Sequence, residues 1–138
     1  MIHGIGTDIV QVARIAASAE RSARFADKVL GPDEMAVYRE RSEKTAGRGL
    51  RYLALRFAAK EAFCKALGMG FRPPMSWHGL QVLSDELGKP VAVANGELLD
   101  YMAQRGLRAQ ISLSDEADYA VAFVVIESVE QAAKEAKK

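Results

Sequence analysis

The sequence predicts an α+β fold in which a largely antiparallel sheet packs against one long central helix. Three observations lead to this prediction. About five strand-like and four helix-like segments are present, and they do not alternate strictly as they would around a parallel sheet. Residues 108–114 and 119–126 read as the two arms of a hairpin. The longest helical run, residues 51–70, contains no proline and ends at glycines.

Length and composition set the broad class of the protein. The chain has 138 residues and is 49% apolar, which predicts one domain with a real core over 1–128 and a charged tail over 129–138. Nineteen Lys and Arg against eighteen Asp and Glu give a net charge of +1, so no broad basic surface for nucleic acid is expected. No apolar stretch reaches the length of a membrane span and no secretion signal is visible, so we expect a cytoplasmic protein without a membrane partner.

The chain opens with a predicted strand over residues 1–12. Its anomaly is Asp8, a carboxylate between Thr7 and Ile9 in an apolar segment. One interpretation is a cap for the helix that follows. The other is a ligand for a hard cation, because carboxylates are what Mg²⁺ takes from proteins.

A helix is predicted over residues 12–24, with arginines spaced along one side. Arg14, Arg21 and Arg24 form either a solvated charged face or a docking patch for an acidic partner. A second helix is expected over 33–40, after a Gly-Pro break. Residues 41–51 are polar and hold two glycines, which predicts a mobile loop.

The central helix combines burial with charge. Its apolar side chains point all round the helix, which is typical of a buried helix. Yet it also carries Arg56, Lys60, Glu61 and Lys65, residue types that are rarely buried without a partner. Glu61 and Lys65 stand four apart and form either an ordinary helix ion pair or part of a site for an extended polyanion. Cys64, the only cysteine, is expected to fill a small apolar position, and no internal disulfide can form.

The remaining elements complete the α+β prediction. Two prolines in residues 71–75 indicate a rigid extended connection, and Trp77 is expected to be a core or interface anchor. A strand over 80–83, a turn over 85–90, a strand over 91–94 and a helix over 96–105 lead to the final hairpin.

Four motifs then occur in an order and spacing that resemble a known family. They are GTDIV at 6–10, FAAKEAFCKALG at 57–68, ELGKP at 86–90, and ISLSDE with YA at 111–120. Each motif alone is weak, but together they resemble the holo-[acyl-carrier-protein] synthases, small 4′-phosphopantetheinyl transferases, from residue 1 to about 128. The resemblance implies the fold of that family and a homotrimer with sites at the subunit interfaces.

The resemblance also implies a reaction and its site residues. The family transfers the 4′-phosphopantetheine of coenzyme A to a serine of acyl carrier protein, for fatty acid biosynthesis, with Mg²⁺ or with Mn²⁺ in its place. Asp8 and Glu61 match the family's metal ligands, and Lys65 matches a phosphate-contacting lysine, so these three are the expected catalytic residues. The expected coenzyme-binding residues are Arg56, Lys60, Lys65, Gly68, Lys89, Pro90 and Ser112. Arg14, Arg21 and Arg24 are expected to dock the acidic carrier protein.

Two questions stay open from the sequence. Many relatives carry histidine where this chain has Asp115, so a role taken from that histidine does not transfer. Glu61, directly or through a water on the metal, is the candidate base for the serine proton, with Asp33 and Asp115 as alternatives. The alternative function is a catalytically silent module that binds coenzyme A or acyl carrier protein, but such a module should have lost a metal carboxylate.

Overall fold

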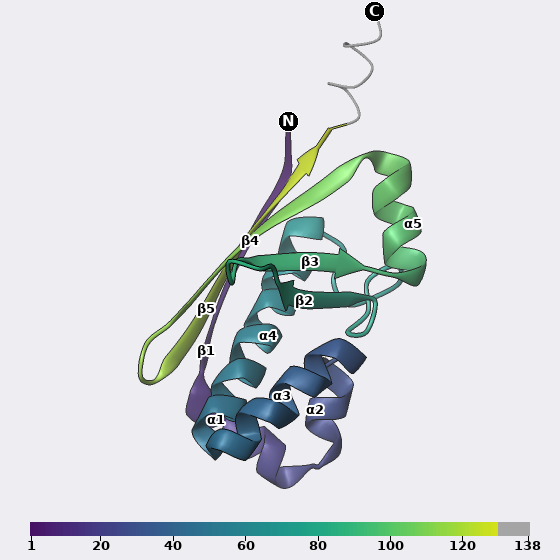
Figure 1. Cartoon of the computed structure of the whole chain (residues 1–138). Helices are drawn as coiled ribbons and strands as arrows, with labels where there is room; N and C mark the ends of the chain where they lie inside the picture. The colour runs from purple at the N-terminus through teal and green to yellow at the C-terminus, as the bar shows by residue number, and fades with distance from the viewer. Residues whose placement is uncertain (130–138) are drawn as a thin grey trace, which may run out of the picture.

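The structure is a computed structural model that describes residues 1–129. The elements follow in the order β1 (Ile2–Gln11), α1 (Val12–Arg21), α2 (Arg24–Val29), α3 (Pro32–Lys44), α4 (Ala46–Leu67), β2 (Leu80–Ser84), β3 (Pro90–Ala94), α5 (Gly96–Arg105), β4 (Leu107–Asp115) and β5 (Tyr119–Ser128) (Figure 1). All strand pairs are antiparallel, so the predicted α+β class with a long central helix is confirmed. The predicted charged tail lies outside the described residues except for Val129.

The main sheet has three strands in the order β1–β5–β4, so β1 and β4 are its edges. Alternation along β5 sends four residues into the core, all fully buried: Ala120, Ala122, Val124 and Ile126. At one end of the sheet the Ser128 amide donates to the Met1 carbonyl and the Met1 ammonium donates to the Ser128 carbonyl, so the first strand begins where the last one ends.

Helix α4 packs against the inner face of this sheet, mostly over β1 and β5 (Figure 1). Its contact with β1 is very close because Gly4 and Gly6 have no side chains. A Cβ at Gly4 would overlap the carbonyl oxygen of Ala66, and one at Gly6 would overlap that of Ala62. The alanine-rich face of α4 and these glycines therefore bring helix and strand backbones together.

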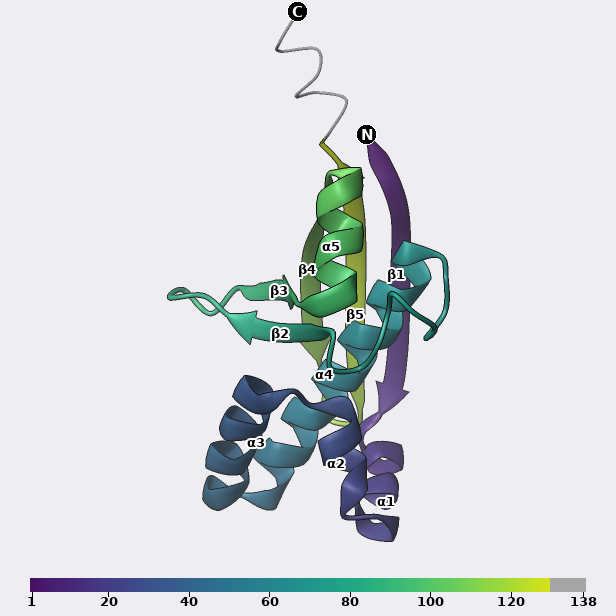
Figure 2. The ribbon, with the colours of Figure 1, turned by 90° about the vertical axis from the view of Figure 1, so that its right-hand side faces the viewer.

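A second sheet, the β2–β3 ribbon, and α5 complete the fold (Figure 2). Helices α1, α2 and α3 gather at one end of the main sheet, while α5 and the N-terminus lie toward the other (Figures 1 and 2). Helix α5 ends at Gly106, whose positive φ forms a left-handed C-cap. Among residues 1–129, no helix is long and apolar enough to cross a membrane.

Two local predictions were wrong. The helix expected over 12–24 is broken at Ser22 and Ala23 into α1 and α2. Residues 41–51, expected to be a mobile loop, belong almost entirely to α3 and α4. Only Thr45 separates these helices, and its hydroxyl accepts a bond from the Arg48 amide at 3.1 Å as an N-cap. The loop prediction failed because this cap lets polar, glycine-containing residues begin a helix whose later turns are buried.

The outer face of the main sheet carries large apolar side chains that remain exposed. Ile5 and Ile9 of β1 are 60% and 62% exposed, and Phe123 of β5 is 44% exposed. Val125, paired with Ile5, lies on the same face. Of the apolar residues that the sequence suggested for an interface, Phe123 and Val125 lie here, whereas Trp77 stacks on Phe71 elsewhere.

Candidate active site

Three of the predicted site residues meet where β1 crosses the second half of α4. The Lys65 ammonium donates to the Asp8 carboxylate at 3.3 Å and to the Thr7 carbonyl at 3.0 Å. Glu61, one turn before Lys65 on α4, lies close enough to Asp8 to feel its charge. The Asp8 side chain is 18% exposed and that of Lys65 is 55% exposed, so the cluster opens to solvent. The close contact of α4 with the β1 glycines produces this meeting.

In this cluster the negative charges of Asp8 and Glu61 are not fully balanced by the nearby Lys65 and Arg14. Burial and the neighbouring Asp8 carboxylate raise the pKa of Glu61, while Lys65 and Arg14 lower it by less. Arg14 of α1 therefore lies beside this cluster within the same chain. Lys65 contacts Asp8, and the charge of Asp8 acts on Glu61, so a cation that binds both carboxylates would relieve their repulsion.

The donor set fits Mg²⁺ better than a metal held by protein ligands alone. Within residues 1–129 no three His, Cys, Asp or Glu side chains are grouped to hold a metal ion. Mg²⁺ binds through one or two carboxylates and fills its other positions with water and substrate phosphates. Asp8 and Glu61 are such a pair. Cys64 is buried, and burial raises the pKa of its thiol, which agrees with the apolar role predicted for it.

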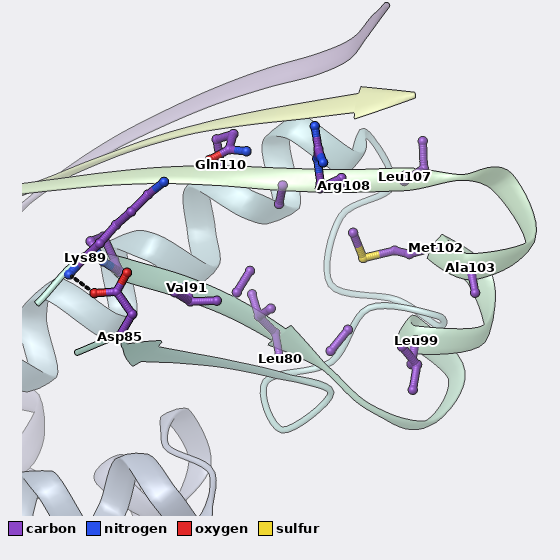
Figure 3. A pocket seen from close by; sticks show the side chains of 14 residues that line it. Leu80, Asp85, Lys89, Val91, Leu99, Met102, Ala103, Leu107, Arg108 and Gln110 are labelled. Carbon is purple, nitrogen blue, oxygen red and sulfur yellow. Dashed lines mark hydrogen bonds between the residues drawn. The ribbon is translucent and has the colours of Figure 1, made fainter. Parts of the chain in front are cut away.

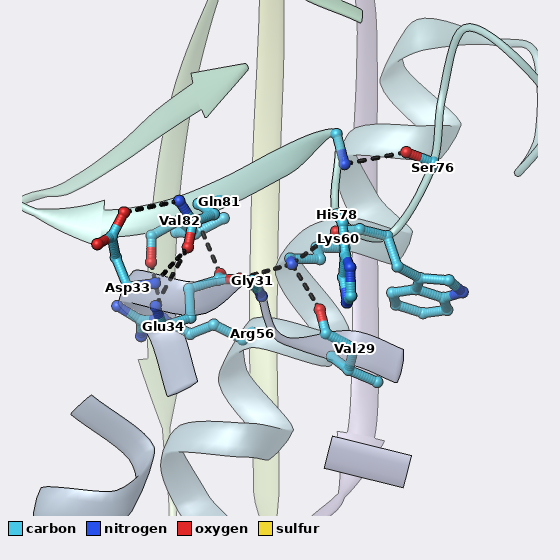
Figure 4. A network of polar contacts seen from close by, with 12 residues as sticks. Val29, Gly31, Asp33, Glu34, Arg56, Lys60, Ser76, His78, Gln81 and Val82 are labelled. Atoms are coloured by element: carbon cyan, nitrogen blue, oxygen red, sulfur yellow. Dashed lines mark hydrogen bonds and ion pairs between the residues drawn. The ribbon is translucent and has the colours of Figure 1, made fainter. Parts of the chain in front are cut away.

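Lys60 and Arg56 were also predicted to contact the coenzyme, and in this structure both side chains are buried and bonded within the chain. Lys60 is fully buried, and its ammonium donates to the Glu34 carboxylate at 2.7 Å (Figure 4). Arg56 is 5% exposed; its Nε donates to the Val82 carbonyl at 3.0 Å and its guanidinium lies over the ring of Tyr52. Both side chains are held by the protein itself, because α3 and β2 cover that side of α4.

The predicted docking arginines lie on α1 and at the start of α2. Arg14, Arg21 and Arg24 are all exposed. Arg21 and Arg24 line a groove of about 330 Å³ together with Phe25 and Lys28. Arg14 lies near the start of α1, where its charge acts on Glu61. The arrangement is a basic surface with an apolar floor that leads toward the carboxylates.

Lys89 and Pro90 are placed apart from Asp8 and Glu61. They line a cleft of about 450 Å³ between the β2–β3 ribbon, α5 and β4, and Arg108 lies on its other side (Figure 3). The Asp85 carboxylate fixes the turn by accepting the Lys89 amide at 2.9 Å. Ser112 is exposed and, by alternation, lies on the outer face of the main sheet, where it pairs with Phe123. Gly68 has φ 88° and caps α4 through its amide to the Cys64 carbonyl.

A cationic pocket at the junction of α3 and α4 was not among the predicted site residues. It has a volume of about 500 Å³ and is lined by Arg41, Lys44, Arg48 and Arg51, with Asp115 at the end of β4. Arg51 donates to Asp115 at 3.4 Å and to the Glu116 carbonyl at 2.7 Å, so it holds the β4–β5 turn. The missed signal was the spacing of basic residues through 41–51, which helices α3 and α4 gather onto one surface.

The buried partner of Lys60 was also missed. Glu34 is the third residue of α3, and its carboxylate reaches back to the Gly31 amide at 2.9 Å. A glutamate at this position after a Gly-Pro break is a recognisable capping signal. The capping role of Glu34 could have been predicted from the sequence, but its ion pair with Lys60 could not.

Comparisons with known proteins agree on one family. Residues 4–124 match the family described as the 4′-phosphopantetheinyl transferase superfamily. A holo-[acyl-carrier-protein] synthase of Paraburkholderia phymatum is 54% identical over 132 residues, which cover 95% of this chain and 98% of the relative. One of Burkholderia ambifaria is 55% identical over 128 residues, 92% of this chain and 88% of the relative.

Solved structures give the same picture. The crystal structure of holo-[acyl-carrier-protein] synthase from Neisseria meningitidis has a TM-score of 0.84 and 41% identity, and covers 92% of this chain and 99% of its own. The synthase from Bacillus anthracis, in complex with CoA (3′,5′-ADP), has a TM-score of 0.77 and 32% identity over 93% of this chain and 98% of its own.

Proposed function

Because the chain belongs to the 4′-phosphopantetheinyl transferase superfamily, we propose that the Asp8–Glu61–Lys65 cluster is its active site. The chain transfers the 4′-phosphopantetheine group from coenzyme A to a serine of apo acyl carrier protein. The products are holo acyl carrier protein and adenosine 3′,5′-bisphosphate, and the reaction serves fatty acid biosynthesis. The observation that carries the site assignment is the contact of Lys65 with Asp8 beside a second carboxylate, Glu61, whose pKa Asp8 raises.

We propose that Asp8 and Glu61 hold Mg²⁺, with Mn²⁺ as a substitute. A bound Mg²⁺ would withdraw charge from the phosphates of the coenzyme and orient them. In support, Asp8 raises the pKa of Glu61, and a cation bound by both carboxylates would relieve that repulsion. The exposed ammonium of Lys65 lies within the same cluster and is placed to bind a phosphate oxygen as a point charge.

The chemistry needs no nucleophile from this chain. The serine oxygen of the carrier protein forms the new bond to the β-phosphorus of coenzyme A, and the bond from that phosphorus to the 3′,5′-bisphosphate breaks. The serine proton needs an acceptor, and we propose Glu61, acting directly or through a water on the metal. Asp33 accepts from Gln81 and Asp115 pairs with Arg51, so both alternatives have partners of their own.

We further propose that the complete site is assembled between subunits of a homotrimer. Asp8 lies on the edge strand β1, whereas the pocket of Arg41, Lys44 and Arg48 adjoins Asp115 at the end of the other edge strand. A neighbouring copy would bring its basic pocket to the carboxylates, where the anionic coenzyme could span both. The exposed apolar outer face of the sheet, with Ile5 and Ile9, is suited to such an assembly.

The trimer can be tested by light scattering after size exclusion. Ile5→Lys places a charge on the outer face without touching the inner one, and we expect it to reduce the mass to that of a monomer. A trimeric Ile5→Lys protein, or a monomeric wild type that still turns over, would contradict assembly through this face.

We propose that α1 and α2 dock the carrier protein, in the cytoplasm as the sequence predicted. The exposed arginines Arg21 and Arg24 border a groove with an apolar residue, Phe25, in its lining. An acidic helix with some apolar side chains would fit that surface by charge and by shape. Arg14 would then lie between the docked partner and Glu61.

The first experiment is the intact mass of an apo acyl carrier protein after incubation with this protein and coenzyme A. We expect a gain of one phosphopantetheine with Mg²⁺ and none with chelator. Two matched controls are a carrier protein whose acceptor serine is alanine and the enzyme variant Glu61→Gln, and neither should give a product.

Two outcomes would change the conclusion. A mass gain that survives chelation would refute the metal assignment while keeping the reaction. Absence of any gain with a folded protein that still binds coenzyme A would favour the silent binding module.

A further inference from the structure

Lys60 is buried in the middle of the molecule with every donor satisfied. Its side chain is 0% exposed, as is that of its ion-pair partner Glu34. The ammonium donates to Glu34 at 2.7 Å, to the Val29 carbonyl at 2.6 Å and to the Trp77 carbonyl at 2.8 Å (Figure 4). Three N–H groups therefore meet three acceptors, which is the full capacity of a lysine.

The three acceptors belong to three different segments. Val29 ends α2, Glu34 begins α3, and Trp77 lies in the connection between α4 and β2. Glu34 extends the network by accepting from the Gly31 amide at 2.9 Å and the Val82 amide at 2.8 Å. A single side chain of α4 is thus tied to α2, α3, β2 and the α4–β2 connection.

Burying the Lys60–Glu34 pair costs desolvation free energy, so the pair is not explained by a gain in stability alone. A buried ion pair seldom gives more stability than apolar residues of the same volume, because both charges lose their water. A fully satisfied buried network instead favours one arrangement over its neighbours. The feature that this network fixes is the rotation and height of α4 relative to the segments around it.

The next residue on the helix is Glu61. On a helix, adjacent residues differ in direction by about 100°, so a constraint on Lys60 also sets where Glu61 points. Contact with Gly4 and Gly6 fixes how near α4 comes to β1. The Lys60 network, on the side of α3 and β2, supplies a directional constraint.

We propose that Lys60 is a positioning residue: its bonds to Glu34, Val29 and Trp77 hold α4 in the rotation that aims Glu61 at Asp8. The inference rests on the proposed function, since it concerns the geometry of the same carboxylate pair. It assigns Lys60 no contact with the coenzyme, the metal or the carrier protein.

The test uses the double variant Lys60→Met/Glu34→Gln, which removes both charges and nearly preserves volume. Its matched control is Leu98→Ala, a cavity variant in α5, whose side chain is fully buried outside the network. Both are compared with wild type for Tm, for kcat and KM, and for Mn²⁺ binding followed by electron paramagnetic resonance without substrate.

We expect the double variant to fold, with kcat and Mn²⁺ affinity each lowered about 10- to 100-fold, as for groups that orient metal ligands. The KM for carrier protein should change less than about twofold, because the docking arginines lie on other elements. Leu98→Ala should lower Tm but leave the Mn²⁺ affinity as in wild type.

Wild-type kcat and Mn²⁺ affinity in the double variant would overturn the inference, as would equal losses in Leu98→Ala. If the double variant does not fold, Lys60→Arg is measured instead, with the same expectations, because a planar guanidinium cannot reach the same three acceptors. A wild type that binds no Mn²⁺ and transfers nothing would refute the proposed function itself, so the two failures are distinguishable.

Discussion

Helix α4 carries two lysines, Lys60 and Lys65, and each forms an ion pair with a carboxylate from another element. The two pairs differ in distance and in exposure to solvent. Lys60 and Glu34 lie 2.7 Å apart with both side chains 0% exposed. Lys65 and Asp8 lie 3.3 Å apart with side chains 55% and 18% exposed. The first pair is closed off by carbonyls of the protein, and the second leaves its charges available.

The difference shows what burial does to an ion pair. The buried pair is saturated, so it can bind nothing else and serves the geometry of the fold. The exposed pair gives little stability, because solvent screens it, and its charges remain free for a ligand. Breaking the first should therefore affect folding most, and breaking the second should affect catalysis most.

The largest effect is expected for Lys60→Met alone. It leaves the Glu34 carboxylate buried without its counter-charge, which should cost about 3–5 kcal/mol of the free energy of unfolding. Urea denaturation measures this cost, and adding Glu34→Gln should recover most of it. A cost below about 1 kcal/mol would show that this pair behaves like an exposed one.

The next effect is expected for Glu61→Gln and Asp8→Ala. Each removes a carboxylate of the proposed metal site, and turnover should fall at least about 10²–10³-fold. The melting temperature should change little, because solvent screens the partly exposed Asp8–Lys65 pair, whereas the Glu34 pair is fully buried. Steady-state rates and thermal melts on the same samples check both statements, and retained turnover would contradict the site.

A smaller effect is expected for Arg14→Glu. The reversal should raise KM for carrier protein roughly tenfold, because it replaces attraction to an acidic partner with repulsion. The KM for coenzyme A should change much less. Equal changes in the two constants, measured with each substrate varied in turn, would refute a docking role for Arg14.

Lys65→Met is the direct counterpart of Lys60→Met. Its effect on stability should stay below about 1 kcal/mol, because the pair is partly exposed and screened. The KM for coenzyme A should rise, since a phosphate-binding charge is lost. Urea denaturation of the two methionine variants side by side would test the comparison, and equal destabilisation would break it.

The smallest effect concerns pH. The folded state raises the pKa of Glu61 above its ordinary value of 4.5, chiefly through burial and then through Asp8. The folded state therefore binds the Glu61 proton more tightly than the unfolded state does. The contribution of Glu61 to the free energy of unfolding is fully present below pH 4.5 and is lost as pH rises through the folded-state pKa. In chelator, Glu61→Gln should thus raise Tm slightly at about pH 8 and leave it unchanged at about pH 4. A lower Tm at about pH 8 would contradict the sign.

The sequence predicted the fold class and the order of most elements, and it singled out the carboxylates Asp8 and Glu61, whose charges act on each other in the structure. These predictions depend on local patterns, such as periodicity, caps and motifs. The burial of Lys60 and Arg56 was not predicted, because helical spacing gives the direction of a side chain but not what packs against it. The cover comes from α3 and β2, which are distant in sequence, and Glu34 was hidden for the same reason.

The pairing of Met1 with Ser128 has a consequence for protein engineering. Because the backbone of β1 begins hydrogen-bonded to the end of β5, a short linker could join these residues and turn the two strands into a hairpin. New termini could then be opened at the exposed β2–β3 turn, beside Leu87, which is 96% exposed. Such a circular permutant would keep Asp8 and Glu61 on one continuous stretch of chain.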